Sequence, residues 1–169
     1  MKKFLLLTLF LIITKNVLAA SMNVIGEEGN SNNVDRIIEI KMYDNYFKPN
    51  FIEVKKGETI KFIVHNLGEM VHEYNIATKE MHLKHQPEMQ KMVEHEILLA
   101  DRIDKVKMKE MSKKDHAMAH KHENSLLLEP KQKGQIIWKF NTDANLEIAC
   151  NVPGHYQLGM ISKLIKLDE

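Results

Sequence analysis

The chain has 169 residues, of which 24 are lysine or arginine and 23 are aspartate or glutamate, so its formal net charge is only +1. This balance argues against nucleic acid as the main partner, because nucleic-acid-binding domains carry an excess of basic residues. The length suits a single domain with a substantial core. The one cysteine cannot form an internal disulfide.

The N-terminus is typical of an export signal. Two lysines precede an apolar run at residues 4–13, and small residues follow at positions 19–21. Together these features predict a cleaved secretory signal peptide at 1–20. The run is too short to span a bilayer comfortably, so we expect a periplasmic or otherwise exported protein with no stable membrane insertion after cleavage. Residues 21–34 are expected to form a flexible N-terminus, and residues 35–169 one domain.

Alternating apolar and polar residues, punctuated by turn residues, predict strands on both sides of a central segment. The first group covers residues 38–42, 51–54, 60–64 and 72–76, and the second covers 126–128, 136–140, 146–150 and 161–167. In the strand at 72–76, Glu73 and Asn75 are expected on the face opposite to His72. Short strands with this punctuation predict an all-β fold, a sandwich or a small barrel.

The central segment, about residues 79–124, is rich in Lys, Glu, Met and His and poor in β-branched residues. We expect a charged, helical insertion, with Pro87 near the start of a helix. Histidines and methionines recur there at spacings of mostly three or four, and a second group crowds together further on: His82, His85, Met89, Met92, and then His116, His120 and His122.

The region with the clearest chemical meaning is the loop from Cys150 to Met160, in which His155 lies midway. A thiolate, an imidazole and a thioether, completed by a second imidazole, form the ligand set of a mononuclear blue-copper centre. Soft sulfur suits Cu(I), and imidazole suits either oxidation state. Gly154 is expected to turn the loop, and Gly159 to allow a close backbone approach before Met160.

The second histidine must come from elsewhere in the chain. His72 shares the inward face of its strand with Tyr74 and Ile76, whereas His65 has the parity opposite to its apolar neighbours and precedes a turn. We therefore expect His72 to be the ligand and His65 to face solvent.

These residues identify a resemblance to the cupredoxins, the plastocyanin- and azurin-like blue copper proteins. The segments that carry it are Tyr46–Ile60, Asn66–Gly68 with His72–Tyr74, and Trp138–Phe140 with Cys150–Met160, within residues 36–78 and 126–168. The Cys-x4-His-x4-Met loop looks most like that of rusticyanin- and auracyanin-type members and of periplasmic copper-tolerance cupredoxins. The chain departs from many members at Glu73, where they carry Asn or Ser.

The resemblance implies an eight-stranded Greek-key β-sandwich that binds one copper ion through His72, Cys150, His155 and Met160. It implies one-electron transfer between copper states, with a redox protein or a copper-handling protein as partner. His155 is then the expected exit route for the electron, and Leu158 part of a small docking patch.

Two interpretations of the insertion remain open at this stage. Its methionines either pack on the sandwich, or they form with its histidines an auxiliary copper site that serves copper tolerance, storage or delivery. The cluster at 116–122 either forms a solvated loop or belongs to such a site. An enzyme is not expected, because copper oxidases and reductases need a second centre built from several His-x-His pairs, and the chain has only His120-Lys121-His122.

Overall fold

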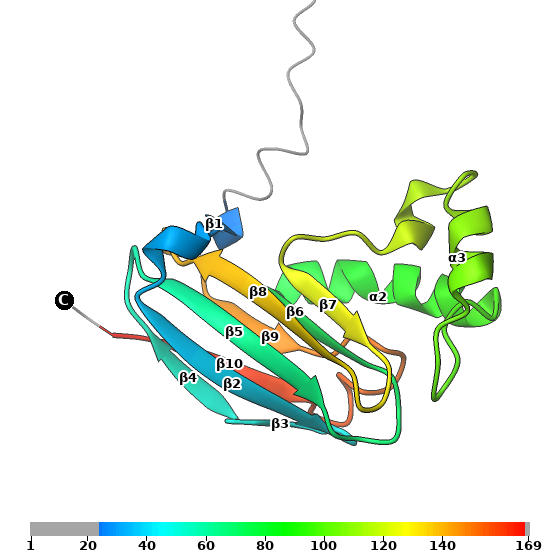
Figure 1. Cartoon of the computed structure of the whole chain (residues 1–169), viewed down its shortest axis with the longest axis horizontal. Helices are drawn as coiled ribbons and strands as arrows, with labels where there is room; N and C mark the ends of the chain where they lie inside the picture. Colours follow the sequence, from blue (N-terminus) through cyan, green and yellow to red (C-terminus); the bar gives the residue numbers. More distant parts are fainter. Residues whose placement is uncertain (1–23, 168–169) are drawn as a thin grey trace, which may run out of the picture.

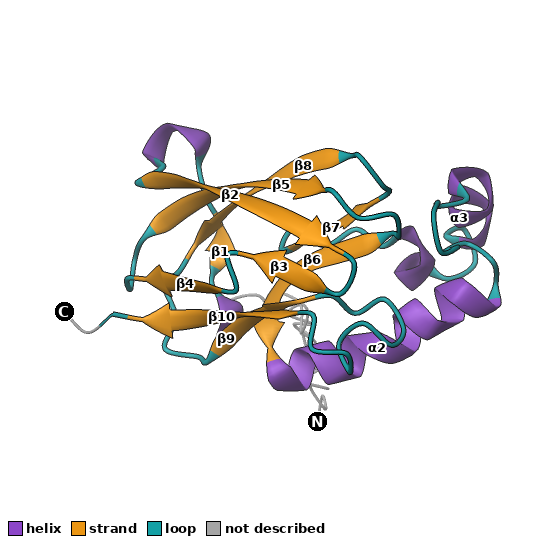
Figure 2. Ribbon diagram, turned by 90° about the horizontal axis from the view of Figure 1, so that it is seen from below, coloured by secondary structure: helices purple, strands orange, loops and turns teal. Residues whose placement is uncertain are grey.

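The computed structural model describes residues 24–167, so the expected signal peptide lies outside the described part. Two five-stranded sheets pack face to face, and a helical segment lies beside one end of this sandwich (Figures 1 and 2). The all-β expectation is therefore confirmed, as is a helical insertion between the two groups of strands.

The first sheet has the order β1-β8-β5-β2-β3, and the second has the order β4-β10-β9-β6-β7. The strands of the first sheet are β1 (Glu27–Glu28), β2 (Arg36–Tyr43), β3 (Tyr46–Lys48), β5 (Thr59–Asn66) and β8 (Lys133–Lys139). Those of the second are β4 (Phe51–Val54), β6 (His72–Thr78), β7 (Ser125–Leu128), β9 (Leu146–Ala149) and β10 (Ile161–Lys166). Only β2 with β5 and β4 with β10 pair in parallel.

The core lies between the sheets and follows from the two-residue period of the strands. In β5 the alternate residues Ile60, Phe62 and Val64 are fully buried, while their neighbours on the other face are partly exposed. Each strand thereby places one apolar face against the opposite sheet, and removal of this surface from water stabilises the sandwich. Aromatic contacts add to it, with the ring of Phe62 5.6 Å from that of Tyr74.

Part of the segment that was expected to be a flexible N-terminus makes specific contacts. Strand β1 pairs with β8, a short 3-10 helix η1 (Ser31–Asn33) follows it, and Ile25 is fully buried. The indole nitrogen of Trp138 donates a hydrogen bond of 2.9 Å to the carbonyl oxygen of Ile25. A buried indole N–H needs such an acceptor, so this contact fixes the chain at residue 25.

The insertion between β6 and β7 contains α2 (Lys79–Glu94), α3 (Lys105–Met111) and the 3-10 helix η2 (His116–Ala119). The prediction that Pro87 stands near a helix start is wrong, because Pro87 lies inside α2. The helix begins eight residues earlier, where the side chain of Thr78 accepts a hydrogen bond from the Met81 N–H as its N-cap. Pro87 removes one hydrogen bond from the helix interior, and the packing of α2 offsets this cost.

The insertion has its own apolar cluster, which is separate from the core of the sandwich. Its buried members are Val71, Met89, Met92, Ile97, Leu98 and Met118. Helix α2 packs on β6 and β9, so the outer face of β6 is also covered. Glu73 and Asn75 do lie on the face opposite to His72, but they are buried there beneath the insertion.

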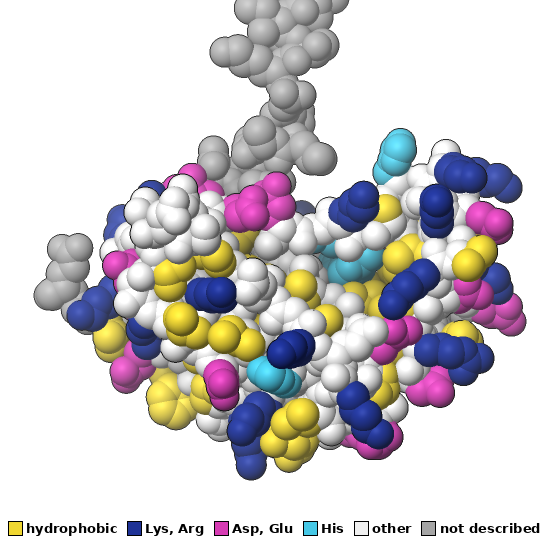
Figure 3. Space-filling model, viewed as in Figure 1, with side chains coloured by type: hydrophobic (Ala, Val, Ile, Leu, Met, Phe, Trp, Pro, Cys, Tyr) yellow, Lys and Arg dark blue, Asp and Glu magenta, His cyan; other side chains and the backbone are white. Residues whose placement is uncertain are grey.

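No helix within residues 24–167 is long and apolar enough to cross a membrane. On the face drawn in Figure 3, basic and acidic side chains alternate without a large field of one sign. This mixing agrees with the formal net charge of +1 and gives no strong electrostatic steering toward a charged partner.

Candidate metal centre

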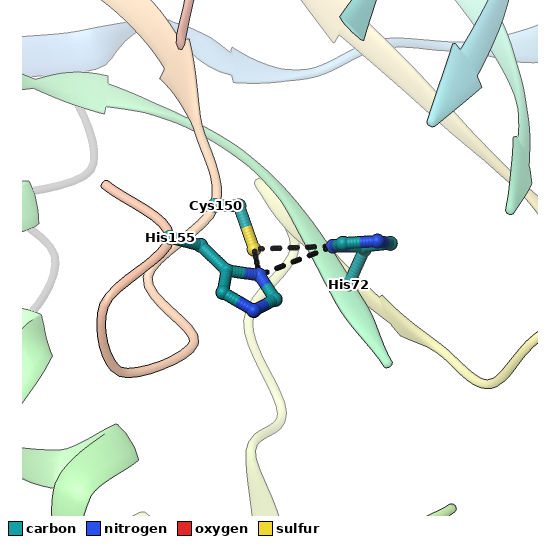
Figure 4. A group of neighbouring side chains, drawn as sticks. All are labelled: His72, Cys150 and His155. Carbon is teal, nitrogen blue, oxygen red and sulfur yellow. Dashed lines mark hydrogen bonds between the residues drawn. The ribbon is translucent and has the colours of Figure 1, made fainter. Parts of the chain in front are cut away.

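The pairing of β6 with β9 brings the chain's only cysteine next to His72. In this antiparallel pair Asn75 lies opposite Ala149, so Cys150, the next residue, lies level with Tyr74, two residues from His72. His155 comes from the loop that joins β9 to β10, and its ring faces the other two side chains (Figure 4). All three side chains are at least nine-tenths buried.

The three side chains are spaced as the ligands of a single metal ion. The sulfur of Cys150 is 3.3 Å from Nδ1 of His155 and 3.9 Å from Nδ1 of His72, and the two nitrogens are 3.2 Å apart. Metal–nitrogen and metal–sulfur bonds of about 2.0–2.3 Å in a trigonal arrangement require ligand separations of about 3.4–3.8 Å. The residues therefore fit a metal ion with little rearrangement.

The loop that carries His155 is held by its own backbone. The Met160 N–H donates to the His155 carbonyl at 3.0 Å, and the Cys150 N–H donates to the Met160 carbonyl at 3.1 Å. These bonds close the loop and place the main chain of Met160 beside that of Cys150. The Met160 side chain is fully buried in the same core cluster as Cys150.

Two glycines give this loop its shape. Gly154 and Gly159 both have φ = +89°, a conformation that residues with a Cβ atom rarely adopt. The expectation that Gly159 allows a close backbone approach is wrong, since an added Cβ atom would meet nothing within 4 Å. The glycine is required by the backbone angle, not by lack of space.

His72 is oriented by Asp44, the residue that follows β2. Its Oδ1 atom lies 3.0 Å from Nε2 of His72, and its carboxylate also accepts hydrogen bonds from the N–H groups of Glu69 and Met70. A proton on Nε2 leaves the lone pair of Nδ1 directed at the metal position. An added Cβ at Gly68 would lie 2.3 Å from Asp44 and 3.0 Å from His72, so this contact does depend on a glycine.

The sulfur of Cys150 accepts a hydrogen bond from the backbone N–H of Glu73 at 3.3 Å. Hydrogen bonds to a ligand sulfur and the polarity around it tune the redox potential of a metal–thiolate centre. No sequence pattern could have revealed this donor, because it is a main-chain group brought close by strand pairing.

Burial sets the protonation states at the centre. It raises the pKa of the Cys150 thiol to about 12, with the Glu73 charge adding to the effect. Burial also lowers the pKa of His155 to about 4, and lowers that of His72 despite the hydrogen bond to Asp44. Near neutral pH both imidazoles are therefore uncharged and ready to bind a metal, and the thiol loses its proton when the metal binds.

The side chain of Glu73 forms a second polar centre on the opposite face of β6. Its carboxylate is fully buried and lies 3.1 Å from Nε2 of His85 and 2.9 Å from Nε2 of His120. Burial alone raises its pKa, but these two histidines outweigh burial and hold the pKa well below its usual range. The same contacts, with Glu88, raise the pKa of His85 to about 9 in spite of its burial.

Of the histidines that the sequence singled out in the insertion, His85, His120 and His122 are brought together, with one ring nitrogen of each within 4.8 Å of the others. His82 lies elsewhere: its Nδ1 accepts from the side-chain amide of Asn151 at 3.1 Å, and its Nε2 lies 3.3 Å from the Glu147 carbonyl oxygen. It thereby braces the segment that follows Cys150. His116 is exposed and outside both groups.

The methionines of the insertion take a different position from its histidines. Met89 and Met92 are fully buried in the apolar cluster with Val71 and Met118. Both side chains therefore contribute to the apolar packing of the insertion. His65 is partly exposed on β5 and belongs to neither histidine group.

Comparison with known proteins agrees with the fold. The chain matches the family model described as a cupredoxin-like domain over residues 4–101, a range that includes His72 and ends before Cys150. It is 38% identical over 145 residues to the copper-resistant cuproprotein CopI of Pseudomonas aeruginosa, covering 82% of this chain and 80% of that protein. CopI of Rubrivivax gelatinosus is 26% identical over 141 residues, covering 83% of this chain and 72% of the relative.

Solved structures of blue copper proteins share the fold. An auracyanin of Roseiflexus castenholzii superposes with a TM-score of 0.54 at 16% identity, covering 79% of this chain and 97% of its own. Auracyanin B superposes with a TM-score of 0.58 at 12% identity, covering 85% and 96%. The two-sheet fold, the family match and the CopI relatives lead to one conclusion: the chain belongs to the cupredoxin family.

Proposed function

We propose that this protein binds one copper ion through His72, Cys150 and His155, with Met160 as the weak axial ligand. The observation that carries the proposal is the convergence of one thiol and two imidazoles, all buried, within 3.9 Å of one another. A buried thiolate with two imidazoles suits copper, and the thioether of a methionine disfavours zinc and the hard cations.

The chain's own residues prepare the centre for a change of one electron. Asp44 fixes the ring of His72, the closed loop fixes His155, and the Glu73 N–H holds the sulfur. Copper, when bound, supplies the Cu(I)/Cu(II) couple. Because the surrounding residues are held by hydrogen bonds before the metal arrives, the ligands need to move little between the two oxidation states.

We assign the physiological role to copper resistance in an exported protein, after removal of residues 1–20. Two relatives that are matched over most of their length are named copper-resistant cuproproteins, and the basic and apolar N-terminus is typical of a secreted chain. The partner is then a copper-handling protein.

Electron carriage to a redox partner is the second candidate role, and one observation favours it. Leu158 is 68% exposed on the loop that carries His155, where an apolar contact would place a partner close to the centre. A small exposed apolar surface of this kind suits a transient complex.

Titration of the metal-free mature protein with Cu(II) tests the centre. We expect an intense thiolate-to-copper absorption band, with narrow copper hyperfine splitting in EPR spectra, that saturates at one copper per chain. Cys150→Ser should remove the band, and His72→Ala should remove or strongly shift it, while the matched variant His65→Ala should keep it. A band that survives in Cys150→Ser would overturn the proposed ligand set.

The axial position is tested by Met160→Leu. The variant keeps the three strong ligands and a buried apolar side chain, so we expect it to retain copper and the thiolate band. Its reduction potential should rise, because an axial electron donor is replaced by an apolar side chain, and this destabilises the more highly charged Cu(II) ion more than Cu(I). A potential equal to that of the wild type, measured by redox titration, would show that Met160 is not a ligand.

Asp44→Ala tests the orientation of His72. Loss of a carboxylate that holds a metal-bound histidine typically lowers metal affinity by about 10–100-fold. Asp143→Ala is the matched control, because Asp143 is exposed and, within residues 24–167, its side chain pairs only with Lys56. Copper affinities measured by competition with a chelator should fall for Asp44→Ala alone, and equal affinities of the two variants would contradict the assigned role.

The role in copper resistance is tested in a bacterial strain that lacks its own copper-resistant cuproprotein. Expression of the full chain should restore growth on copper, and His65→Ala should do so equally well. Cys150→Ser should fail, because the proposed centre requires the thiolate. A chain that binds copper with the expected spectrum but never restores growth would favour electron carriage instead.

A further inference from the structure

We propose that His85, His120 and His122, together with the carboxylate of Glu73, form a second metal site for a borderline divalent cation, with Cu(II) preferred. The site lies between the outer face of β6 and the insertion. It shares no ligand residue with the first centre, so it does not depend on the function proposed above. Of the insertion's candidate residues it uses three histidines, and it leaves out His82, His116 and the methionines.

The three imidazoles converge from two separate segments. His85 comes from α2, whereas His120 and His122 come from the link between η2 and β7. Their ring centroids form a nearly equilateral triangle with sides of 5.4, 5.2 and 5.1 Å. Histidine bonds to a metal of about 2.0–2.1 Å place ligand nitrogens about 3.3–4.1 Å apart. Nitrogens already within 4.8 Å of one another therefore reach a metal with small side-chain rotations.

The buried carboxylate supplies the charge that a cation site needs. Oε1 of Glu73 faces the Nε2 atoms of His85 and His120, and the carboxylate is fully buried. Within residues 24–167 these two histidines are its only ion-pair partners, and no lysine or arginine pairs with it. A buried carboxylate requires a positive charge and hydrogen bonds, and the side chains of Asn75, Ser125 and Asn151 already donate to this one. A divalent cation between the imidazoles and Glu73 takes the place of the positive charge that a protonated His85 supplies in the metal-free protein.

The surroundings resemble those of known histidine metal sites. Nδ1 of His85 lies 2.9 Å from a carboxylate oxygen of Glu88, so Nε2 is the nitrogen directed at Glu73. Carboxylates that hold the second nitrogen of a metal-binding histidine are a regular feature of such sites. His120 has φ = +45° and ψ = +47°, a left-handed conformation that is sparsely populated and that concentrates at functional sites.

The site is open on one side, so a metal can enter. His122 is exposed, and nothing in the described part of the chain hydrogen-bonds to its ring. Figure 3 shows histidine at the surface in the hollow between the sandwich and the helical insertion. Three imidazoles and a carboxylate suit Cu(II) and Zn(II), and the general order of divalent affinities places Cu(II) above Zn(II).

Glu73 joins this site to the first centre. The side chain of Glu73 reaches the histidines, while its backbone N–H donates a hydrogen bond to the Cys150 sulfur. Asn151, the residue after Cys150, donates two hydrogen bonds to Oε2 of Glu73, one from its backbone N–H at 3.2 Å and one from its side-chain amide at 2.7 Å. A cation bound at the second site therefore changes the charge and position of a residue in contact with the metal-binding sulfur.

Metal binding by Cys150→Ser separates the two sites. This variant keeps the second site intact, so Zn(II) followed by calorimetry, and Cu(II) followed by EPR, should still bind with imidazole-type spectra and no thiolate band. His122→Gln should lower that affinity by at least about tenfold, since loss of a ligand costs no less than loss of its supporting group. Because the His122 ring is exposed and forms no hydrogen bond, this variant should fold as the wild type does.

The matched control is the double variant His95→Gln, His116→Gln. Both histidines are exposed on the same insertion and lie outside the cluster, so the Zn(II) affinity in the Cys150→Ser background should not change. Equal losses in the control and in His122→Gln would show binding to a histidine-rich surface and overturn the site. Absence of Zn(II) binding in Cys150→Ser would also overturn it, and would assign Glu73 and its histidines to attachment of the insertion alone.

Coupling is measured on wild-type protein whose first centre already holds one copper. Addition of one equivalent of Zn(II) should shift the thiolate-to-copper band and the reduction potential, and His122→Gln should abolish the shift. A protein without any thiolate band would refute the first centre while leaving the Zn(II) results in Cys150→Ser unaffected. The failures of the two proposals are therefore distinguishable.

Discussion

The hydrogen-bond network of the buried Glu73 carboxylate is the interaction on which the packing of the insertion against the sandwich depends. A charged carboxylate away from water costs several kcal/mol unless it is paired and fully hydrogen-bonded. Here the side chains of Asn75, Ser125 and Asn151 donate to it, and His85 and His120 lie within 3.1 Å. These five partners come from β6, β7, the loop after β9 and both ends of the insertion, so one residue ties together segments that are distant in sequence.

This network also explains why the insertion packs where it does. Without α2 and the link before β7, the outer face of β6 would leave Glu73 without its histidines. The apolar cluster around Met89 and Met92 stabilises the same interface by burial. The insertion is therefore attached both by apolar packing and by the polar network of Glu73. The cluster keeps the helices against the sheet, and the polar contacts fix their register.

The first centre combines residues placed by paired strands with residues placed by a short loop. His72 and Cys150 are placed by adjacent strands of one sheet, and Asp44 holds the outer nitrogen of His72. Of the four residues proposed as ligands, only His155 and Met160 depend on a loop. Backbone hydrogen bonds close this loop, and two glycines with positive φ shape it. Such a frame suits a metal that changes charge without changing its ligands, and it continues directly through Glu73 to the histidines of the insertion.

The sequence by itself indicated an all-β fold, the position of the insertion and the loop that carries Cys150, His155 and Met160, because strand periodicity and ligand spacing within one loop are local properties of the chain. The preference for His72 over His65 followed from strand parity, and the sandwich arrangement followed from the resemblance to the cupredoxins. The sequence placed Pro87 at a helix start and assigned Gly159 to a close approach, because helix capping at Thr78 and the backbone angle at residue 159 are set by neighbours in space. Only the tertiary structure decided that Asp44 supports His72, that the Glu73 N–H meets the sulfur, and that His85 joins His120 and His122. These contacts span from 28 to 77 positions of sequence, and strand pairing and packing, not local propensity, bring such residues together.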